Sequence, residues 1–225
     1  MNVTYIHHSG FLIETNRFYY LFDYESGDLP YLNTDKPIYV LSSHSHQDHY
    51  NSHIFSLLKN KGMKYIKAIL SDDIEIPKDV DTLQVSPHNT YELDKNLKLF
   101  TLKSTDLGVA FLIEDEELLI YHAGDLNDWI WEDESEEYNQ QMTTDYQHEI
   151  YILSKQLNNR IIDLAFVVLD PRQEKDYDKG ICYYIENIET HIIYPMHYWD
   201  QPSIIDQFIN EHPQYINKIY KEREE

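Results

Sequence analysis

A histidine-rich stretch at residues 43–50, Ser-His-Ser-His-Gln-Asp-His-Tyr, constrains this chain more than any other feature. The apolar run at 38–41 precedes it and is typical of a buried strand. Asn51 or Ser52 follows and can cap a helix over 51–61, which Gly62 would end. The stretch therefore lies on a strand-to-helix turn, where α/β folds often present their chemistry. Its four metal-competent side chains predict a metal site: His44, His46, Asp48 and His49.

The hydrophobic pattern predicts a strand-rich first half and an alternating second half. Strand-like runs lie near 2–7, 10–14, 18–23, 38–42, 64–70, 82–86, 97–103, 108–114 and 117–122. Later, predicted helices at 134–158, 180–189 and 202–211 alternate with strands at 164–169, 191–196 and 215–220. No linker or repeat divides the sequence, so we expect one domain over 1–225 with two sheets and helices outside them.

Charge and cysteine content narrow the class of partner. The net charge is −22, which repels nucleic-acid backbones and anionic membrane surfaces. A small anionic substrate is still compatible with this negative charge, because bound metal cations can make the local electrostatic potential positive. We expect no secretory leader, because the first residues are strand-like and lack a basic segment followed by an apolar one. No apolar run reaches the roughly 18 residues needed to span a bilayer. Cys182 is the only cysteine, so no intramolecular disulfide is possible, and we expect a cytoplasmic protein. The charge leads us to expect a small-molecule substrate. Exposed tyrosines could support a homo-oligomer.

The order of the motifs resembles one known superfamily. His44-x-His46-x-Asp48-His49 resembles the signature of the metallo-β-lactamase-fold, metal-dependent hydrolases. The segments Tyr-His-Ala-Gly-Asp at 121–125 and Tyr-Pro-Met-His-Tyr at 194–198 resemble later parts of that pattern. The opening at 6–13 resembles the first hairpin of a branch that contains phosphate-ester lactonases and uncharacterised hydrolases. The resemblance covers nearly the whole chain.

This resemblance implies a fold and a ligand set. The fold would be α+β, a four-layer αββα sandwich of two mixed β-sheets with helices outside. One or two divalent metals, Zn, Mn or Fe, would lie at its rim. His44 and His46 would hold the first metal, and Asp125 would bridge both. The second metal would be bound by Asp48, His49 and His197.

The sequence departs from the family at one ligand. The first metal normally takes a third histidine, but the corresponding stretch at 103–109 reads Lys-Ser-Thr-Asp-Leu-Gly-Val. Asp106 is the natural substitute, and it is equally compatible with a simple turn residue. An oxygen-rich ligand set would shift the preference from Zn toward Mn or Fe, whereas a weak or empty first site is also compatible. His88 lies in a predicted turn and is not expected to bind metal.

Several other residues have two interpretations. We expect His8 to be a hydrogen-bonding residue beneath the site, and His122 to support the ligands or pack in the core. Arg172 follows the buried strand at 164–169 and suits a substrate carboxylate or phosphate, or a surface ion pair. Tyr198 and Trp199 would wall the substrate pocket or pack internally.

These residues together predict a metal-dependent hydrolase. A metal-bound hydroxide would attack a carbonyl or phosphoryl centre, with Asp48 and Asp125 as catalytic residues that orient it. The substrate would be a small ester, lactone, amide or phosphate ester, which the sequence does not identify further. The alternative is a metal-binding sensor or partner-binding protein on the same fold with little hydrolytic activity. The missing third histidine motivates that alternative.

Overall fold

The computed structural model describes residues 1–221, and the chain forms two compact units. The first unit contains residues 1–86 and 107–109, and the second contains 87–106 and the chain from 110 onward. A single domain over 1–225 stays a prediction.

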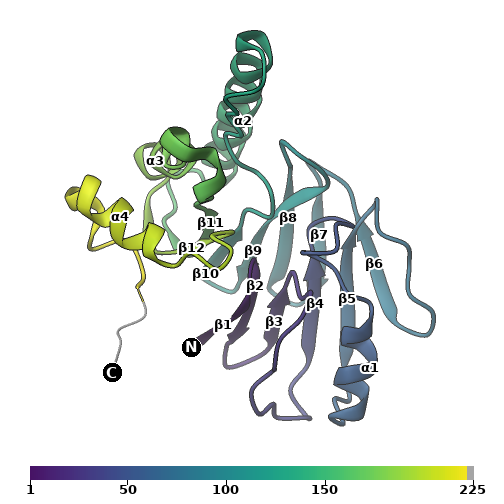
Figure 1. Ribbon diagram of the computed structural model, residues 1–225. Helices are drawn as coiled ribbons and strands as arrows, with labels where there is room; N and C mark the ends of the chain where they lie inside the picture. Colours follow the sequence, from purple (N-terminus) through teal and green to yellow (C-terminus); the bar gives the residue numbers. More distant parts are fainter. Residues whose placement is uncertain (222–225) are drawn as a thin grey trace. The chain divides into compact units, whose positions relative to one another are not determined.

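The first unit is built on a mixed six-stranded sheet in sequence order (Figure 1). Its antiparallel part is β1 (Asn2–His7), β2 (Gly10–Glu14) and β3 (Tyr19–Phe22). From β3 the sheet continues in parallel through β4 (Ile38–Ser42), β5 (Ile66–Ser71) and β6 (Asp81–Val85). β3 and β4 are buried at every position, as expected of parallel strands covered on both faces. Helix α1 (His53–Asn60) adds Ile54, Phe55 and Leu58 to this unit's core.

The second unit contains another mixed six-stranded sheet, in the order β12-β11-β10-β9-β8-β7. Its strands are β7 (Thr90–Asp94), β8 (Leu97–Lys103), β9 (Val109–Asp115), β10 (Leu118–His122), β11 (Ile162–Val168) and β12 (Thr190–Met196). β10, β11 and β12 run parallel, whereas β9 and β10 form an antiparallel hairpin.

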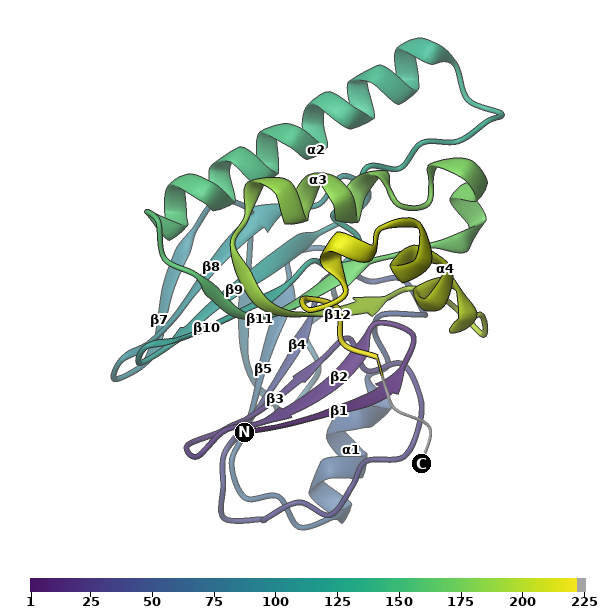
Figure 2. The same ribbon diagram turned by 90° about the vertical axis from the view of Figure 1, so that its left-hand side faces the viewer.

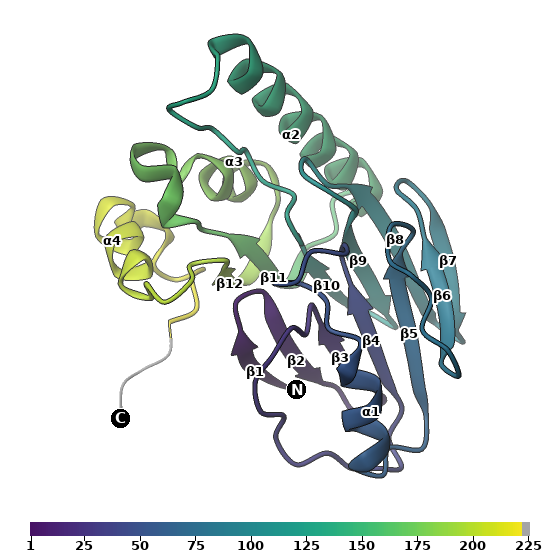
Figure 3. The same cartoon turned by 45° about the vertical axis from the view of Figure 1, so that its right-hand side comes forward.

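The helices of the second unit lie on its sheet. Helices α2 (Glu136–Leu157) and α3 (Lys179–Asn187) run side by side along one face (Figures 2 and 3). Ser135 caps α2 by accepting a hydrogen bond from the Tyr138 amide, with Glu136 and Glu137 in the first turn. Helix α4 (Ser203–Glu211) follows β12, and two short 3-10 helices cover Pro171–Asp176 and Pro213–Tyr215.

The structure confirms the α+β class, with two mixed six-stranded sheets that carry helices. The predicted helices and nearly all predicted strands are present, but β7 was not predicted. The expected strand at 215–220 is wrong: this segment forms a 3-10 turn and one bridge between Ile219 and Ile193. Within residues 1–221, no helix combines the length and the hydropathy needed to cross a bilayer.

Candidate metal centre

The histidine-rich turn follows β4, as predicted, and it is fixed at several backbone positions. The His46 carbonyl accepts hydrogen bonds of 3.0 Å from the amides of His49 and Tyr50. The Ser45 amide donates to Asp73, which follows β5, at 2.8 Å. Burial raises the pKa of this Asp73 carboxyl, but hydrogen bonds from neighbouring serines lower it overall. The ionised carboxylate therefore holds the backbone between the two histidines of the His-x-His pair.

A buried carboxylate that the sequence did not indicate orients the histidines of this turn. Asp23 directly follows β3 and is fully buried. Its Oδ2 lies 2.8 Å from Nδ1 of His49 and 2.7 Å from Oγ of Ser43, and its Oδ1 accepts the Ser43 amide at 2.7 Å. A carboxylate can only accept, so His49 carries its proton on Nδ1 and its Nε2 lone pair is left to act as a ligand.

The same carboxylate reaches His44 through Ser43. The Ser43 hydroxyl donates its one proton to Asp23, and it lies 3.0 Å from Nδ1 of His44. It must therefore accept from His44 Nδ1–H, which leaves the Nε2 lone pair for a metal. His44 Nε2 and His46 Nδ1 lie 3.0 Å apart. Two imidazole nitrogens on one tetrahedral zinc lie about 3.3 Å apart, so this pair fits a shared ion.

His8 and Asp48 lie beside His49 in the first unit. His8 Nε2 is 3.6 Å from Asp48 Oδ2, and the His8 and His49 rings meet edge to face at 5.4 Å. One donor atom from each of these residues lies within 4.8 Å of the others. His8 is buried and has a positive φ of 52°, which the Tyr5 hydroxyl supports by accepting its amide proton. His8 therefore lies beside Asp48 and His49 within this unit, and its supporting role stays a prediction.

Gly108 explains how the chain packs against this turn. The Val109 amide donates to the Ser43 carbonyl at 2.9 Å. Gly108 has a φ of +71°, and a Cβ there would lie 2.0 Å from the Ser43 oxygen and 2.7 Å from His44 Cβ. Only glycine can occupy this position without moving the His44 backbone.

The second unit brings Asp125 and His197 together. Asp125 follows β10 and His197 follows β12, and their Oδ1 and Nε2 atoms lie 3.3 Å apart. The Trp129 indole donates to the Asp125 carbonyl at 2.9 Å, and its ring lies 5.4 Å from that of His197. His122 Nδ1 accepts the Gly124 amide at 3.1 Å, so His122 fixes the backbone that leads to Asp125.

Asp170 was also missed by the sequence analysis, and it orients His197. It follows β11, is fully buried, and accepts from His197 Nδ1 at 2.8 Å. Arg172 donates to the same carboxylate from Nε and Nη2, at distances down to 2.5 Å. Burial raises the pKa of Asp170, but the hydrogen bonds from His197 and Arg172 lower it to about 2.

The predicted pocket residues Arg172 and Trp199 surround this carboxylate. The Trp199 indole lies 3.4 Å from Asp170 Oδ2, and the Arg172 guanidinium lies over the Trp199 ring at 4.6 Å. Trp199 also contacts the His197 ring at 5.7 Å. Both residues therefore support His197 while remaining partly exposed. Tyr198 lies between His197 and Trp199 in the sequence and is half-buried.

Asp106 lies beside Asp125 within the second unit. A carboxylate oxygen of each lies within 4.8 Å of the other. The neighbouring Thr105 fixes this arrangement, because its hydroxyl donates to the Asn127 carbonyl at 2.6 Å and accepts the Asn127 amide at 3.0 Å. Asp106 also lines a cavity of about 330 Å³ together with His88, Lys103 and His148. His88 forms a turn, and its Nε2 is 2.9 Å from Glu149.

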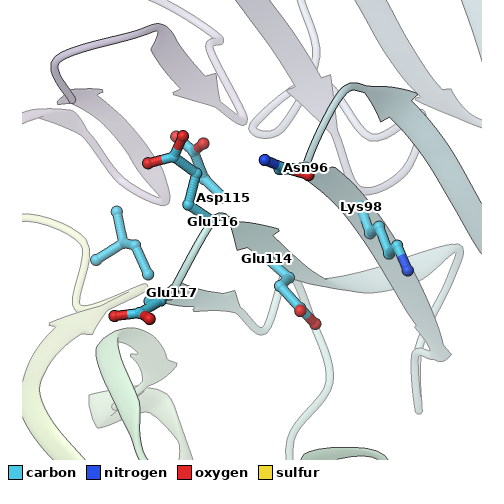
Figure 4. Close-up of a pocket in the computed structure, with 7 residues that line it drawn as sticks. Asn96, Lys98, Glu114, Asp115, Glu116 and Glu117 are labelled. Carbon is cyan, nitrogen blue, oxygen red and sulfur yellow. The ribbon is translucent and has the colours of Figure 1, made fainter.

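A larger cavity lies elsewhere and lacks the predicted site residues. It has a volume of about 650 Å³ and lies around the turn between β9 and β10, where Glu114, Asp115, Glu116 and Glu117 project (Figure 4). Arg160 neutralises Glu114 at 2.8 Å. Lys98 and these carboxylates line the cavity without a histidine, so its size alone does not indicate a reaction.

Solved structures share this fold at low sequence identity. Igni18, a metallo hydrolase from Ignicoccus hospitalis, matches with a TM-score of 0.68 and 16% identity, over 98% of this chain and 94% of that one. Zn²⁺-bound PqqB from Methylobacterium extorquens matches with a TM-score of 0.56 and 12% identity, over 94% and 82%.

CmlA, a diiron β-hydroxylase from Streptomyces venezuelae, matches with a TM-score of 0.61 and 11% identity. The match covers 98% of this chain but only 52% of CmlA, so this chain spans about half of that protein. No curated protein matches this sequence. The model of the β-lactamase superfamily domain matches residues 2–145, which is more than half of the chain. The two mixed sheets, the histidine-rich turn after β4 and this match agree: the chain belongs to the β-lactamase superfamily.

Proposed function

We propose that this protein is a metal-dependent hydrolase of a small ester, lactone, amide or phosphate ester. The observation that carries the proposal is the pair of buried carboxylates, Asp23 and Asp170, each 2.8 Å from Nδ1 of a histidine. Metal-binding histidines are held in this way, since the carboxylate fixes the tautomer and raises the basicity of the ligand nitrogen. A purely structural core would gain little from two buried ionised carboxylates.

The proposed ligands are nitrogen and carboxylate donors that suit one or two divalent ions, Zn, Mn or Fe. They are His44, His46, Asp48, His49, Asp125 and His197, with Asp106 in place of the missing histidine. The donors fit such ions: His44 and His46 present nitrogens 3.0 Å apart, and Asp106 and Asp125 offer neighbouring oxygens. Asp106 lies two residues before Gly108 in the chain, and Gly108 packs against His44. The metals of two structural neighbours, the diiron pair of CmlA and the Zn²⁺ of PqqB, are consistent with this range.

A bound divalent metal would lower the pKa of a water molecule and stabilise negative charge that develops on the substrate. The chain's own residues would complete the chemistry. Asp48 and Asp125 would accept hydrogen bonds from the attacking water and orient it. Asp170 would keep the His197 proton on Nδ1, so that this imidazole keeps its ligand role throughout the reaction.

We propose that the substrate is small and polar. The cavity beside Asp106 holds about 330 Å³ and carries the amine of Lys103 and the imidazoles of His88 and His148. The Arg172 side chain is 46% exposed and has donors beyond those bound to Asp170. It would bind an anionic group of the substrate, with Tyr198 and Trp199 as walls. The charge of −22 supports a small-molecule partner over nucleic acid or a membrane surface, and a single cysteine supports a cytoplasmic location.

Elemental analysis and a hydrolysis panel test the proposal. Protein stripped of metal and reloaded with Zn, Mn or Fe should hydrolyse at least one ester, lactone, amide or phosphate ester. Asp125→Ala should reduce that rate by roughly 10³-fold or more, because it removes a ligand and an orienting group. His191→Gln, an exposed change on β12, is the matched control and should retain activity. Absence of hydrolysis across the panel in fully metal-loaded protein would contradict the proposal.

A metal-binding sensor or partner-binding protein is the second candidate. The stretch at 103–106, which lacks the third histidine, favours it. Metal stoichiometry of Cys182→Ser protein, in which no thiol-bound ion adds to the count, weighs the two candidates: two tightly held ions favour hydrolysis, whereas one ion or none favours the sensor.

A further inference from the structure

We propose a second, separate metal site in this protein, formed by Asp178, Cys182 and His212 and suited to zinc. The three residues lie in the second unit, and one donor atom of each lies within 4.8 Å of the others. None of them belongs to the ligand set of the proposed hydrolase. The inference is therefore independent of that function.

The local structure places the three donors at one point. Asp178 is the residue before α3, and the Cys182 amide donates to its carbonyl at 2.9 Å, so their side chains share one face of the first helical turn. His212 directly follows α4, where its amide donates to the Phe208 carbonyl. Its ring lies 4.8 Å from that of Phe208 and 5.9 Å from that of Tyr215, which fixes its direction.

The distances distinguish a chelate from a catalytic relay. In a Cys-His-Asp relay, the sulfur and the carboxylate contact opposite nitrogens of the imidazole. Here Nε2 of His212 is the nitrogen nearer to both: it lies 2.6 Å from Asp178 Oδ2 and 3.8 Å from Cys182 Sγ. In a tetrahedral zinc site, bonded nitrogen and sulfur atoms lie about 3.5 Å apart. The sulfur and the carboxylate oxygen thus lie at the same nitrogen, and a bound ion would replace the Nε2–H···O hydrogen bond and separate those two atoms to about 3.3 Å.

The surroundings favour a cation. The three residues line a cavity of about 480 Å³ to which Asp128 and Glu186 add carboxyl groups. The side chains of Asp178 and His212 are 22% and 23% exposed, so an ion and a completing water can enter. A thiolate, an imidazole and a carboxylate together select zinc over magnesium or calcium, which prefer oxygen donors. On binding, the Cys182 thiol would release its proton to solvent and form the sulfur–metal bond. The proton that His212 Nε2 donates to Asp178 would move to Nδ1 or to solvent, which frees the Nε2 lone pair for the metal.

The site would connect α3 to the end of α4. A bound ion would join the first turn of one helix to the residue that ends the other. Such an ion stabilises the folded chain, because the unfolded chain cannot present the three donors together.

Cobalt titration tests the site specifically, because Cys182 is the only cysteine in the chain. Metal-free protein titrated with Co²⁺ should develop the near-ultraviolet charge-transfer band of a cobalt–thiolate bond. The final intensity of the band should correspond to one cobalt–thiolate bond per chain. Zn²⁺ should abolish the band by displacement and raise Tm. Asp125→Ala impairs the hydrolase site but should retain the cobalt–thiolate band and its displacement by Zn²⁺. Failure of one proposal is therefore distinguishable from failure of the other.

Three variants and one control complete the experiment. Cys182→Ser should lose the band and show a smaller Zn²⁺-dependent rise in Tm than wild type, because only the hydrolase site is left to bind zinc. His212→Gln and Asp178→Asn should require at least tenfold more Co²⁺ to develop the band. The exposed His191→Gln is the control and should bind as wild type does. An absent band in folded wild-type protein with excess Co²⁺ would mean that Asp178 and His212 form only an ion pair beside a thiol. A band that persists unchanged in both His212→Gln and Asp178→Asn would equally overturn the site.

Discussion

Asp170 and His197 meet at 2.8 Å because they follow two neighbouring parallel strands. β11 ends at Val168 and β12 ends at Met196, and Val168 and Met196 are paired in the parallel ladder. The first unit repeats the arrangement, since Asp23 follows β3 and Ser43 follows the parallel strand β4. In both units, one strand supplies a buried carboxylate and its neighbour supplies the chain segment that carries histidine.

Asp23→Asn should weaken metal binding by roughly 10–100-fold and also lower Tm. The Asp23 carboxylate accepts hydrogen bonds from the Ser43 amide, the Ser43 hydroxyl and His49 Nδ1. In asparagine, the NH₂ group is itself a donor and would face at least one of these donors without forming a hydrogen bond. Metal titration of stripped protein measures the first effect and thermal unfolding the second. Asp28→Asn changes an exposed carboxylate of the following loop and should alter neither. Wild-type metal affinity in Asp23→Asn would contradict the orienting role.

Asp170 should make the metal-free protein sensitive to acid. Its folded pKa of about 2 is below the usual 3.8, so the ionised form stabilises the fold above about pH 4. That stabilisation, on the order of 2 kcal/mol, is lost as the pH falls toward 2. Urea unfolding at pH 5 and pH 3 should therefore show a larger loss of stability for wild type than for Asp170→Asn. Equal losses in the two proteins would show that other carboxyl groups dominate acid unfolding.

Gly108→Ala should destabilise the protein by at least ~3 kcal/mol and impair metal binding at His44. The added Cβ would lie 2.0 Å from the Ser43 carbonyl oxygen, so the histidine-rich turn must move. Gly62→Ala is the matched control, because Gly62 also has a positive φ, of +85°, but its nearest contact is Thr34 Cγ2 at 3.7 Å. That change should cost only about 1–2 kcal/mol, the strain of the left-handed backbone. Similar costs for both glycines, measured by urea unfolding, would rule out the steric explanation.

Cys182 should react slowly with alkylating reagents in metal-free protein. Burial, with the nearby charges of Asp178 and Glu186, raises the pKa of the thiol from 9.0 to about 12. At pH 8 the thiolate fraction is then about a thousandfold lower than for an unperturbed cysteine. Iodoacetamide labelling followed by mass spectrometry should show this slow rate in the fold and a fast rate in urea. Fast labelling of the folded protein would contradict the raised pKa.

The sequence predicted the residues that carry local patterns. The His44–His49 motif and the long strands have spacings of their own, so they can be read without a structure. Asp23 and Asp170 could not be read in this way, because their partners lie 26 and 27 positions away in the chain. A usable signal was present: each is an aspartate directly after a fully buried apolar run. β7 was missed because Glu92 and Asp94 are residue types depleted in strands, and the pairing with β8 overrides that preference.

The Asp23 carboxylate serves His49 directly and His44 through the Ser43 hydroxyl. The basicities of the two imidazoles are thus linked through one shared acceptor. An ion that draws electron density from His49 would make its Nδ1–H a stronger donor to Asp23, and Asp23 would then accept less strongly from Ser43. By thermodynamic reciprocity, binding at either histidine then alters the affinity at the other to the same degree. Metal loading of this turn is therefore expected to depart from the behaviour of two independent sites.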